Sequence, residues 1–435
     1  MRRPNIVFIV ADDLGFADLG CYGARVPVSP VLDRLAAQGV RFSQGYANAP
    51  VCSPTRFALM TGRYQYRLRG AAEEPINSRS RGSATLGLPP DHPTLPSLLK
   101  DAGYRTGLMG KWHLGYPPAF GPLRSGYDEF FGPMSGGVDY FSHCDSRGTH
   151  DLWQGESEHH QDGYLTDLIS KRAVDFIERA ATPHGAPFFL SVHYTAPHWP
   201  WETRDDAALA AEVKDNLFHL HGGNIHSYRR MIGHMDEGIG WIMAALAAKG
   251  VVDETLVVFT SDNGGERFSD NWPLVGGKMD LTEGGIRVPW IAHWPRRSRI
   301  GVTSEQQCMT MDWTATLLDA ADVAADPGHP LDGVSLMRVL ADPDATFDRP
   351  LRWRMNHRGQ RALRTGRWKY LRVDDHDYLF DLSADERERA NHGGRDPARL
   401  AALRADWETW NATMPPIPAD ATVSLGYGAK DMPQR

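Results

Sequence analysis

Four short apolar runs, rich in β-branched and aromatic residues, divide the first 261 residues of the chain. Such runs predict strands that are buried on both faces of a sheet. Longer segments with helical spacing of their apolar residues lie before or between these runs, and several of them end at a glycine. Strands are expected at residues 5–11, 104–109, 187–194 and 255–261, and helices at 30–38, 94–102, 164–180 and 227–249. Ser29 is expected to cap the first of these helices.

The alternation of strands and helices predicts an α/β fold, a large, mainly parallel mixed sheet sandwiched by helices. Past residue 290 the pattern changes to short helices at 312–321 and 335–341 and a linker at 343–350. Short strands at 362–364, 368–373 and 378–382 and a helix at 397–411 then predict a small antiparallel sheet with one helix. We therefore expect a catalytic domain at 1–345, a C-terminal α+β subdomain at 346–413 and a surface-wrapping tail at 414–435.

Polar residues follow directly after each of the four predicted strands. In a parallel sheet, ligands bind beyond the carboxyl ends of the strands. The side chains in these positions are therefore expected at one edge of the sheet. They are Asp12 and Asp13 after the first strand, Lys111 and His113 after the second, His198 after the third, and Asp262 and Asn263 after the fourth.

Asp12, Asp13, Asp262 and Asn263 supply hard oxygen ligands from two strand ends. Oxygen ligands of this kind suit Ca²⁺ or Mg²⁺ rather than zinc. For Asp12 and Asp13 taken alone, a pair of loop caps is an equal alternative. Both pairs together favour a metal site, because several buried carboxylates without a cation would repel one another.

Cys52 opens the stretch Cys52-Ser53-Pro54-Thr55-Arg56. Pro54 suits the first turn of a helix and Gly62 suits its end, so Cys52 is expected at a helix N-terminus. Free N–H groups and the positive end of the helix dipole meet there, and they favour an anion or a reactive group. A buried structural cysteine is the alternative. Arg56, one turn further on, is placed to reach back to residue 52.

Three cations, Arg56, Lys111 and Lys278, are candidates to surround a tetrahedral oxyanion at this edge. Lys278 follows two glycines that allow close backbone approach, although a single loop lysine is commonly just solvated. His113 and His198 are candidates for proton transfer, because imidazole titrates near neutral pH. Either histidine alone would more often be structural.

Polar and aromatic residues in the long loops are candidate substrate contacts, although loops are rich in such residues in any protein. These candidates are Asp139, His143, Arg147, His150, Trp199, Trp201, Arg267 and Trp272.

Composition narrows the classes of function. A net charge of -7 argues against a nucleic-acid partner, and no apolar segment is long enough to span a membrane. Four cysteines without paired spacing argue against a disulfide framework or a zinc ribbon. The first residues do not resemble a signal peptide, so a cytoplasmic location is expected, or a periplasmic one if a leader was removed.

The motifs together resemble the formylglycine-dependent sulfatases of the alkaline phosphatase superfamily. Cys52-Ser53-Pro54-Thr55-Arg56 resembles the signature that directs oxidation of the cysteine to formylglycine. The second signature is matched around Gly110-Lys111-Trp112-His113. Further matches, across nearly the whole chain, are residues 5–13, Pro197-His198, Asp262-Asn263-Gly264, Gly277-Lys278, residues 283–289, Trp368-Lys369-Tyr370 and residues 378–382.

This resemblance implies an alkaline-phosphatase-like fold and a mechanism. Formylglycine at position 52 would be hydrated, with one hydroxyl bound to Ca²⁺, less plausibly Mg²⁺, and deprotonated by Asp262. Arg56, Lys111 and Lys278 would balance the charge on the transferred group. His198, with Lys278, would protonate the leaving oxygen, and His113 would deprotonate the second hydroxyl to expel sulfate.

The resemblance implies a small sulfate ester as substrate and a formylglycine-generating enzyme as partner. The leaving group stays open between an aryl and a carbohydrate alcohol. A phosphonate monoester or phosphodiester hydrolase of the same superfamily is the alternative enzyme. A catalytically silent anion-binding protein on this scaffold is the alternative outside catalysis.

Overall fold

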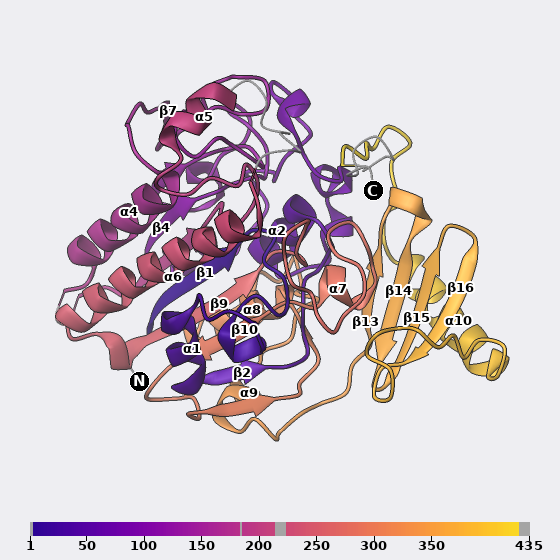
Figure 1. The fold of residues 1–435 in the computed structure, drawn as a ribbon. Helices are drawn as coiled ribbons and strands as arrows, with labels where there is room; N and C mark the ends of the chain where they lie inside the picture. The colour runs from indigo at the N-terminus through magenta and orange to yellow at the C-terminus, as the bar shows by residue number, and fades with distance from the viewer. Residues whose placement is uncertain (1–2, 183–184, 214–222, 426–435) are drawn as a thin grey trace.

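In the computed structural model, which describes residues 3–182, 185–213 and 223–425, a ten-stranded mixed sheet forms the centre of the molecule (Figure 1). Five neighbouring strands run parallel at its middle, in the order β9-β1-β8-β4-β5. They are β9 (Thr255–Ser261), β1 (Asn5–Ala11), β8 (Phe188–His193), β4 (Arg105–Gly110) and β5 (Glu129–Gly132). The predicted α/β sheet is confirmed, with four of these strands at the expected places.

Shorter strands extend the sheet at both edges. On the β9 side lie β10 (Trp290–His293), β2 (Val40–Phe42) and β11 (Val302–Ser304), and on the β5 side lie β6 (Trp153–Gln154) and β7 (Ser157–Glu158). A separate pair is formed by β3 (Gly45–Tyr46) and β12 (Cys308–Met309). With two to four residues each, these strands are too short to show a period of their own in the sequence.

Helices cover both faces of the sheet. One face carries α1 (Pro30–Ala37), α4 (Leu165–Ala180) and α6 (Ile225–Ala248), the last two side by side in Figure 1. The other face carries α2 (Cys52–Thr61), α3 (Leu95–Asp101), α8 (Met311–Ala320) and α9 (Met337–Ala341). The loops add α5 (Ala207–Val213), α7 (Glu283–Ile286) and the 3-10 helices Gly20–Tyr22, Gln65–Arg67, Arg69–Ala72, Ser78–Ser80, Leu123–Ser125, Val252–Glu254 and His357–Gly359.

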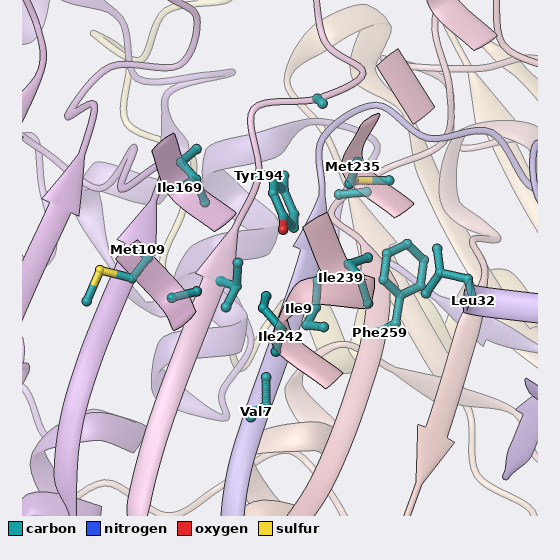
Figure 2. Packing of buried hydrophobic residues seen from close by; sticks show 14 of the residues in the cluster. Val7, Ile9, Leu32, Met109, Ile169, Tyr194, Met235, Ile239, Ile242 and Phe259 are labelled. Atoms are coloured by element: carbon teal, nitrogen blue, oxygen red, sulfur yellow. The ribbon is translucent and has the colours of Figure 1, made fainter. Parts of the chain in front are cut away.

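The central strand β1 shows why both faces need helices. Successive side chains of a strand point to opposite faces, and here every one of them is buried. Val7 and Ile9 pack into the core beneath α4 and α6 (Figure 2), whereas Phe8 and Val10 pack into the core beneath α2, α3 and α8. An uninterrupted apolar run is therefore the pattern that this position requires.

The start of α1 is capped differently from the expectation. The Ser29 hydroxyl makes no capping bond to the helix; it accepts a hydrogen bond from the Gly20 N–H at 2.9 Å. The carboxylate of Asp236, on α6, instead accepts hydrogen bonds from the N–H groups of Val31 at 2.9 Å and Leu32 at 2.8 Å. The prediction of a local cap was wrong because a buried carboxylate from a packed helix satisfies these donors.

The C-terminal part forms a four-stranded antiparallel sheet with one helix, as predicted, and stands beside the main body in Figure 1. Its elements are β13 (Leu351–Arg354), β14 (Arg361–Thr365), β15 (Trp368–Val373), β16 (His376–Asp381) and α10 (Pro397–Asn411). The sequence prediction missed β13, which directly follows the predicted linker. The boundaries at 345 and 413 stay predictions.

A buried charge cluster joins this sheet to the main body. The Lys369 ammonium contacts Glu283 Oε1 at 2.9 Å and Glu388 Oε1 at 2.8 Å, and the Glu283 N–H donates to Glu388 Oε2 at 2.6 Å. The Trp353 indole also donates to the Ala47 carbonyl at 2.8 Å. Charges that are buried and mutually paired fix the relative placement of the two parts, because loss of one partner leaves an unpaired charge.

The tail after α10 returns to the main body. The Glu74 N–H donates to the Thr422 carbonyl at 2.9 Å, and the Ser424 N–H donates to the Glu74 carbonyl at 3.0 Å. These bonds attach residues 422–424 to the main body, residues 426–435 lie outside the described part, and the surface-wrapping course of the tail stays a prediction. Of the helices in the described part, none has the length and apolar character needed to cross a bilayer.

Replacing Asp236 by alanine tests the long-range cap. Two buried N–H groups of α1 would lose their acceptor, so we expect the free energy of unfolding to fall by about 2–3 kcal/mol in chemical denaturation followed by circular dichroism. Glu237→Ala is the matched control, because it removes an exposed carboxylate of the same helix that contacts Arg204 at 2.6 Å. That change should cost less than about 1 kcal/mol. Equal losses for both variants would contradict the capping role.

Candidate active site

The carboxyl ends of the parallel strands bring the predicted polar residues together. Asp12 and Asp13 follow β1, Asp262 follows β9 and Lys111 follows β4. Because these strands lie next to one another or one strand apart, their ends open onto one edge of the sheet. Cys52 is the first residue of α2, as predicted, and its side chain is buried at the same place.

Arg56 ties α2 to the sheet. Its Nε donates to Asp262 Oδ2 at 2.9 Å, its Nη2 forms an ion pair with the same oxygen at 2.8 Å, and its Nη1 donates to the Lys111 carbonyl at 3.1 Å. His193 Nδ1, at the end of β8, lies 3.4 Å from the same Nη1. The guanidinium is therefore held in one orientation from three strands.

The two lysines each pair with a carboxylate. Lys278 Nζ donates to Asp13 Oδ2 at 2.7 Å, and Lys111 Nζ donates to Asp12 Oδ2. With the pair of Arg56 and Asp262, three cations and three carboxylates share one buried volume. Fully ionised, they would cancel to a net charge of zero, which is the condition for burying so many charges.

Neighbouring charges set the pKa values of these carboxyls. Burial raises the pKa of Asp13, but Lys278, His198 and Lys111 outweigh this effect and bring it to about 2. Burial and then the charge of Asp12 raise the pKa of Asp262 to about 6, against the pull of Arg56. Asp262 is therefore the more basic of these two carboxyls.

The two histidines present different ring nitrogens. His113 Nε2 lies 2.6 Å from the Ile76 carbonyl, and a carbonyl only accepts, so the proton is assigned to Nε2 and Nδ1 is the free acceptor. His198 Nδ1 lies 2.6 Å from the Trp199 carbonyl, so its Nε2 faces the site, 3.6 Å from Asp13 Oδ2.

Both imidazoles are neutral in this arrangement. Burial and then the charge of Lys111 lower the pKa of His113 well below its ordinary value. Burial and then the charge of Lys278 lower the pKa of His198 to about 3. An anion bound beside them would favour their protonated forms.

Four side chains with metal-binding donor atoms lie close together at this edge of the sheet. Asp12, Asp13, Cys52 and His198 each offer one ligand atom, and these four atoms all lie within 4.8 Å of one another. Asp12 Oδ1 and Asn263 Oδ1 are buried without a hydrogen-bond partner in the described part of the chain. Acceptors left in this state fit a cation with oxygen ligands. The residues present therefore fit a metal such as Ca²⁺.

Two site residues have unusual backbone angles, and one glycine leaves space for a catalytic candidate. Asp13 and His113 adopt left-handed backbone angles, with φ of 63° and 60°. Non-glycine residues reach this region only when their surroundings hold them there. A Cβ on Gly136 would lie 2.3 Å from the His113 ring, so only glycine leaves room for the imidazole.

A cavity of about 240 Å³ opens from Cys52. The catalytic candidates His113 and His198 lie in its wall. The remaining wall comes from five separate segments of the chain: Pro75, Ile76, Asn77, Ser78 and Arg79; Ser135, Gly136 and Gly137; Asp145, Ser146 and Arg147; Trp199; and Ser424 and Leu425.

Of the eight residues predicted to contact substrate, Arg147 and Trp199 line this cavity. Asp139 is fully buried, and its Oδ1 accepts from the N–H groups of its own turn at 3.0 and 2.6 Å. His143 is buried with Nε2 3.1 Å from a backbone carbonyl. The last two hold loop structure in this arrangement.

The other four lie outside the cavity lining. His150 Nε2 is 2.9 Å from a backbone carbonyl. Trp201 is buried, and the Arg267 guanidinium lies 5.7 Å from the centre of its ring. Trp272 is exposed, with the guanidinium of Arg387 4.3 Å from its ring centre.

Several site residues escaped the sequence prediction. His193 ends a predicted strand, but nothing in the sequence separates it from a packed histidine. The carbonyl of Ile76 and the hydrogen of Gly136 act through the backbone and carry no side-chain signal. Ser424 and Leu425 reach the cavity only through the fold of the tail.

The ends of the parallel strands surround a cysteine at a helix terminus. Paired carboxylates and cations and two imidazoles lie around it, and this arrangement is typical of hydrolases that act on esters of tetrahedral oxyanions. The chain belongs to the sulfatase family. The family model described as Sulfatase matches residues 4–323.

Individual relatives agree. The chain is 33% identical to N-acetylgalactosamine-6-sulfatase of Homo sapiens over 80% of its own length and 68% of that protein. It is 33% identical to arylsulfatase A of Homo sapiens over 93% of its own length and 87% of that protein. The predicted activity, hydrolysis of a sulfate ester, is confirmed by these relatives.

A solved structure agrees in fold. The crystal structure of Ps i-CgsB in complex with k-i-k-neocarrahexaose superposes with a TM-score of 0.84 at 32% identity. The match covers 94% of this chain and 93% of that one. The chain is therefore a sulfuric ester hydrolase of alkaline-phosphatase-like fold, which sets aside the catalytically silent alternative.

Deleting residues 419–435 tests the part that the tail plays in the cavity. The wall positions of Ser424 and Leu425 would be lost, whereas the strand-end residues stay in place. We expect KM for an aryl sulfate to rise about tenfold with kcat changed by less than about threefold. Deletion of 426–435 alone is the control and should leave KM unchanged. If the longer deletion also left KM unchanged, the tail would have no role in binding.

Proposed function

We propose that this chain hydrolyses the sulfate monoester of a carbohydrate, using Ca²⁺ and a formylglycine made from Cys52. One observation carries the proposal. The Cys52 sulfur lies within 4.8 Å of the ligand atoms of Asp12, Asp13 and His198, at the first residue of a helix. A nucleophile generated at that position sits beside a metal site and an array of cations.

The state of the cysteine supports its modification. Burial raises the pKa of the Cys52 thiol, although Lys111 and Lys278 act in the opposite direction. A neutral thiol is a poor nucleophile, and it has one attacking atom. Hydrated formylglycine supplies two hydroxyls on one carbon, one to attack sulfur and one to expel sulfate afterwards.

In the attack on sulfur, a carboxylate accepts the proton and the cations stabilise charge. Asp262 is the proton acceptor for the attacking hydroxyl, since its pKa of about 6 makes it more basic than Asp13. Arg56, Lys111 and Lys278 face the transferred group and stabilise the charge on its oxygens. Held by their carboxylate partners, these cations need little reorganisation during the reaction.

The imidazoles act on the two leaving oxygens. Once a bound anion favours the protonated form of His198, its Nε2, beside Lys278, is the position from which a proton reaches the ester oxygen of the alcohol. His113 Nδ1 is the free acceptor that removes the proton of the second hydroxyl. The Ile76 carbonyl fixes the tautomer that leaves this nitrogen free.

Asp12, Asp13, Asp262 and Asn263, with residue 52, would hold the calcium ion. Bound there, calcium would supply positive charge for the sulfate oxygens and lower the pKa of the attacking hydroxyl. His198 also lies within the reach of this cluster.

The proposal of a carbohydrate as leaving group draws support from the cavity and from relatives. The cavity wall combines Trp199, a flat face for a sugar ring, with polar groups such as Asn77 and Ser78. Two of the compared proteins are named for or bound to carbohydrates. A formylglycine-generating enzyme is the proposed partner that modifies Cys52.

Mass spectrometry of the peptide that contains residue 52 tests the nucleophile. We expect the mass of the aldehyde in place of the thiol when the protein is produced with the modifying enzyme. Cys52→Ala should lower kcat/KM at least about a thousandfold, because no other group replaces the nucleophile. Cys144→Ala removes a thiol outside the site and should keep activity. A fully active sample that carries only unmodified cysteine would refute the proposal.

Calcium analysis tests the metal site independently of activity. We expect about one calcium per chain, lost on treatment with a chelator together with activity and restored by Ca²⁺ better than by Mg²⁺. Asp12→Ala should bind less than about a tenth of this amount. Asp145→Asn alters a carboxylate in the same cavity but outside the cluster, and should keep its calcium. Full activity without bound metal would exclude the calcium site.

A further inference from the structure

Arg79 and Arg147 line the cavity that opens from Cys52, and both are exposed. Their backbones are fixed, since the Arg79 N–H donates to Asn77 Oδ1 at 2.8 Å and the Arg147 N–H to Asp145 Oδ1 at 2.9 Å. Within the described part of the chain, neither guanidinium makes a hydrogen bond or an ion pair. Both are cations available to a ligand.

Asp145, the one carboxylate among the described residues that line the cavity, does not balance them. Its Oδ2 accepts from Arg81 Nη2 at 2.9 Å. Its Oδ1 accepts from the backbone N–H groups of Arg147 at 2.9 Å and Thr149 at 3.1 Å. The Asp145 carboxylate is thus fully engaged, and the two positive charges have no hydrogen-bond or ion-pair partner among the residues that the structure describes.

The sulfate group of the substrate does not account for these charges. A sulfate monoester carries a single negative charge, and Arg56, Lys111 and Lys278 already stand around residue 52 for it. Those three cations are buried and come from α2, the end of β4 and the loop before α7. Arg79 and Arg147 come from two other loops and are exposed. Their position therefore fits a different part of the substrate.

We propose that Arg79 and Arg147 form a second anion subsite, which binds a carboxylate or a second sulfate on the leaving group. This inference rests on the proposed function. The cavity volume of about 240 Å³ lies below the range of roughly 300–1,000 Å³ that encloses a drug-sized ligand. One ring fits inside, so the second anion stands on the ring that bears the scissile sulfate or on its immediate neighbour.

The test compares single-ring probes that differ only in the second group. The probes are 3-acetylphenyl sulfate, which has a neutral substituent, 3-carboxyphenyl sulfate and benzene-1,3-diyl disulfate. Their Kd values are measured by calorimetry on the Cys52→Ala chain in calcium-containing buffer, so that binding is read without turnover. We expect the two dianionic probes to bind at least about tenfold more tightly than the monoanionic 3-acetylphenyl sulfate, and the stronger of them identifies the preferred anion.

Matched variants assign the effect to the two arginines. Arg79→Met with Arg147→Met should abolish the preference and leave the Kd of the monoanionic probe within about twofold. Arg79→Lys with Arg147→Lys should retain a part of the preference, because the charge remains. Arg34→Met with Arg299→Met is the control: both are exposed, lie outside the cavity lining and lower the net charge equally. This control should keep the preference for the dianionic probes. It should also keep the weakening of their binding by added salt.

Equal Kd values for the monoanionic and dianionic probes would overturn the subsite. Equal weakening of all three probes by the methionine pair would overturn it as well, because it would indicate a general loss of the cavity. Failure of the proposed function has a different signature. The unsubstituted, modified chain would then release no sulfate from any of the three probes, whatever their Kd values.

Discussion

The structure depends on a balance of buried charge at the carboxyl ends of its central strands. Three carboxylates and three cations lie there, and each cation contacts a carboxylate: Arg56 with Asp262, Lys111 with Asp12 and Lys278 with Asp13. Removing one member would leave a charge without a partner in a region that excludes water, at a cost of about 3–5 kcal/mol. This requirement constrains the backbone around it, including the left-handed Asp13 and His113.

The same balance links stability to chemistry. Because the charges cancel in pairs, a divalent cation and an anionic ester can enter together without a large change in net charge. The three cations are held in fixed orientations by their carboxylate partners at the strand ends. Preorganisation of this kind is the usual source of electrostatic catalysis. The pairing that permits burial therefore also prepares the site.

The parts of this arrangement that depend on local chemistry could be predicted from the sequence. Strands buried on both faces, such as β1 and β9, carry uninterrupted apolar runs, and their ends could be predicted to the residue. The start of α2 at Cys52 and its end at Gly62, with φ of 66°, follow from proline and glycine preferences. The convergence of the strand-end residues followed from the rule for parallel sheets.

Long-range contacts set the rest, and the sequence pattern does not contain them. Asp236 caps α1 across about 200 positions of the chain, with separations of 205 and 204 residues. His193 contacts the Arg56 guanidinium, but the sequence does not distinguish it from the other residues of a buried strand. Of eight polar and aromatic loop residues expected near substrate, two line the cavity. The composition of a loop does not reveal where its side chains point.

The C-terminal part shows what a second layer of structure adds to such a site. Its sheet is joined to the main body through Lys369 and Glu283, and Glu283 begins the short helix α7 that follows the Lys278 loop. Its tail then passes Glu74 and places Ser424 and Leu425 in the cavity wall. The C-terminal part thus contacts the segment that follows Lys278 and also contributes two residues to the cavity wall.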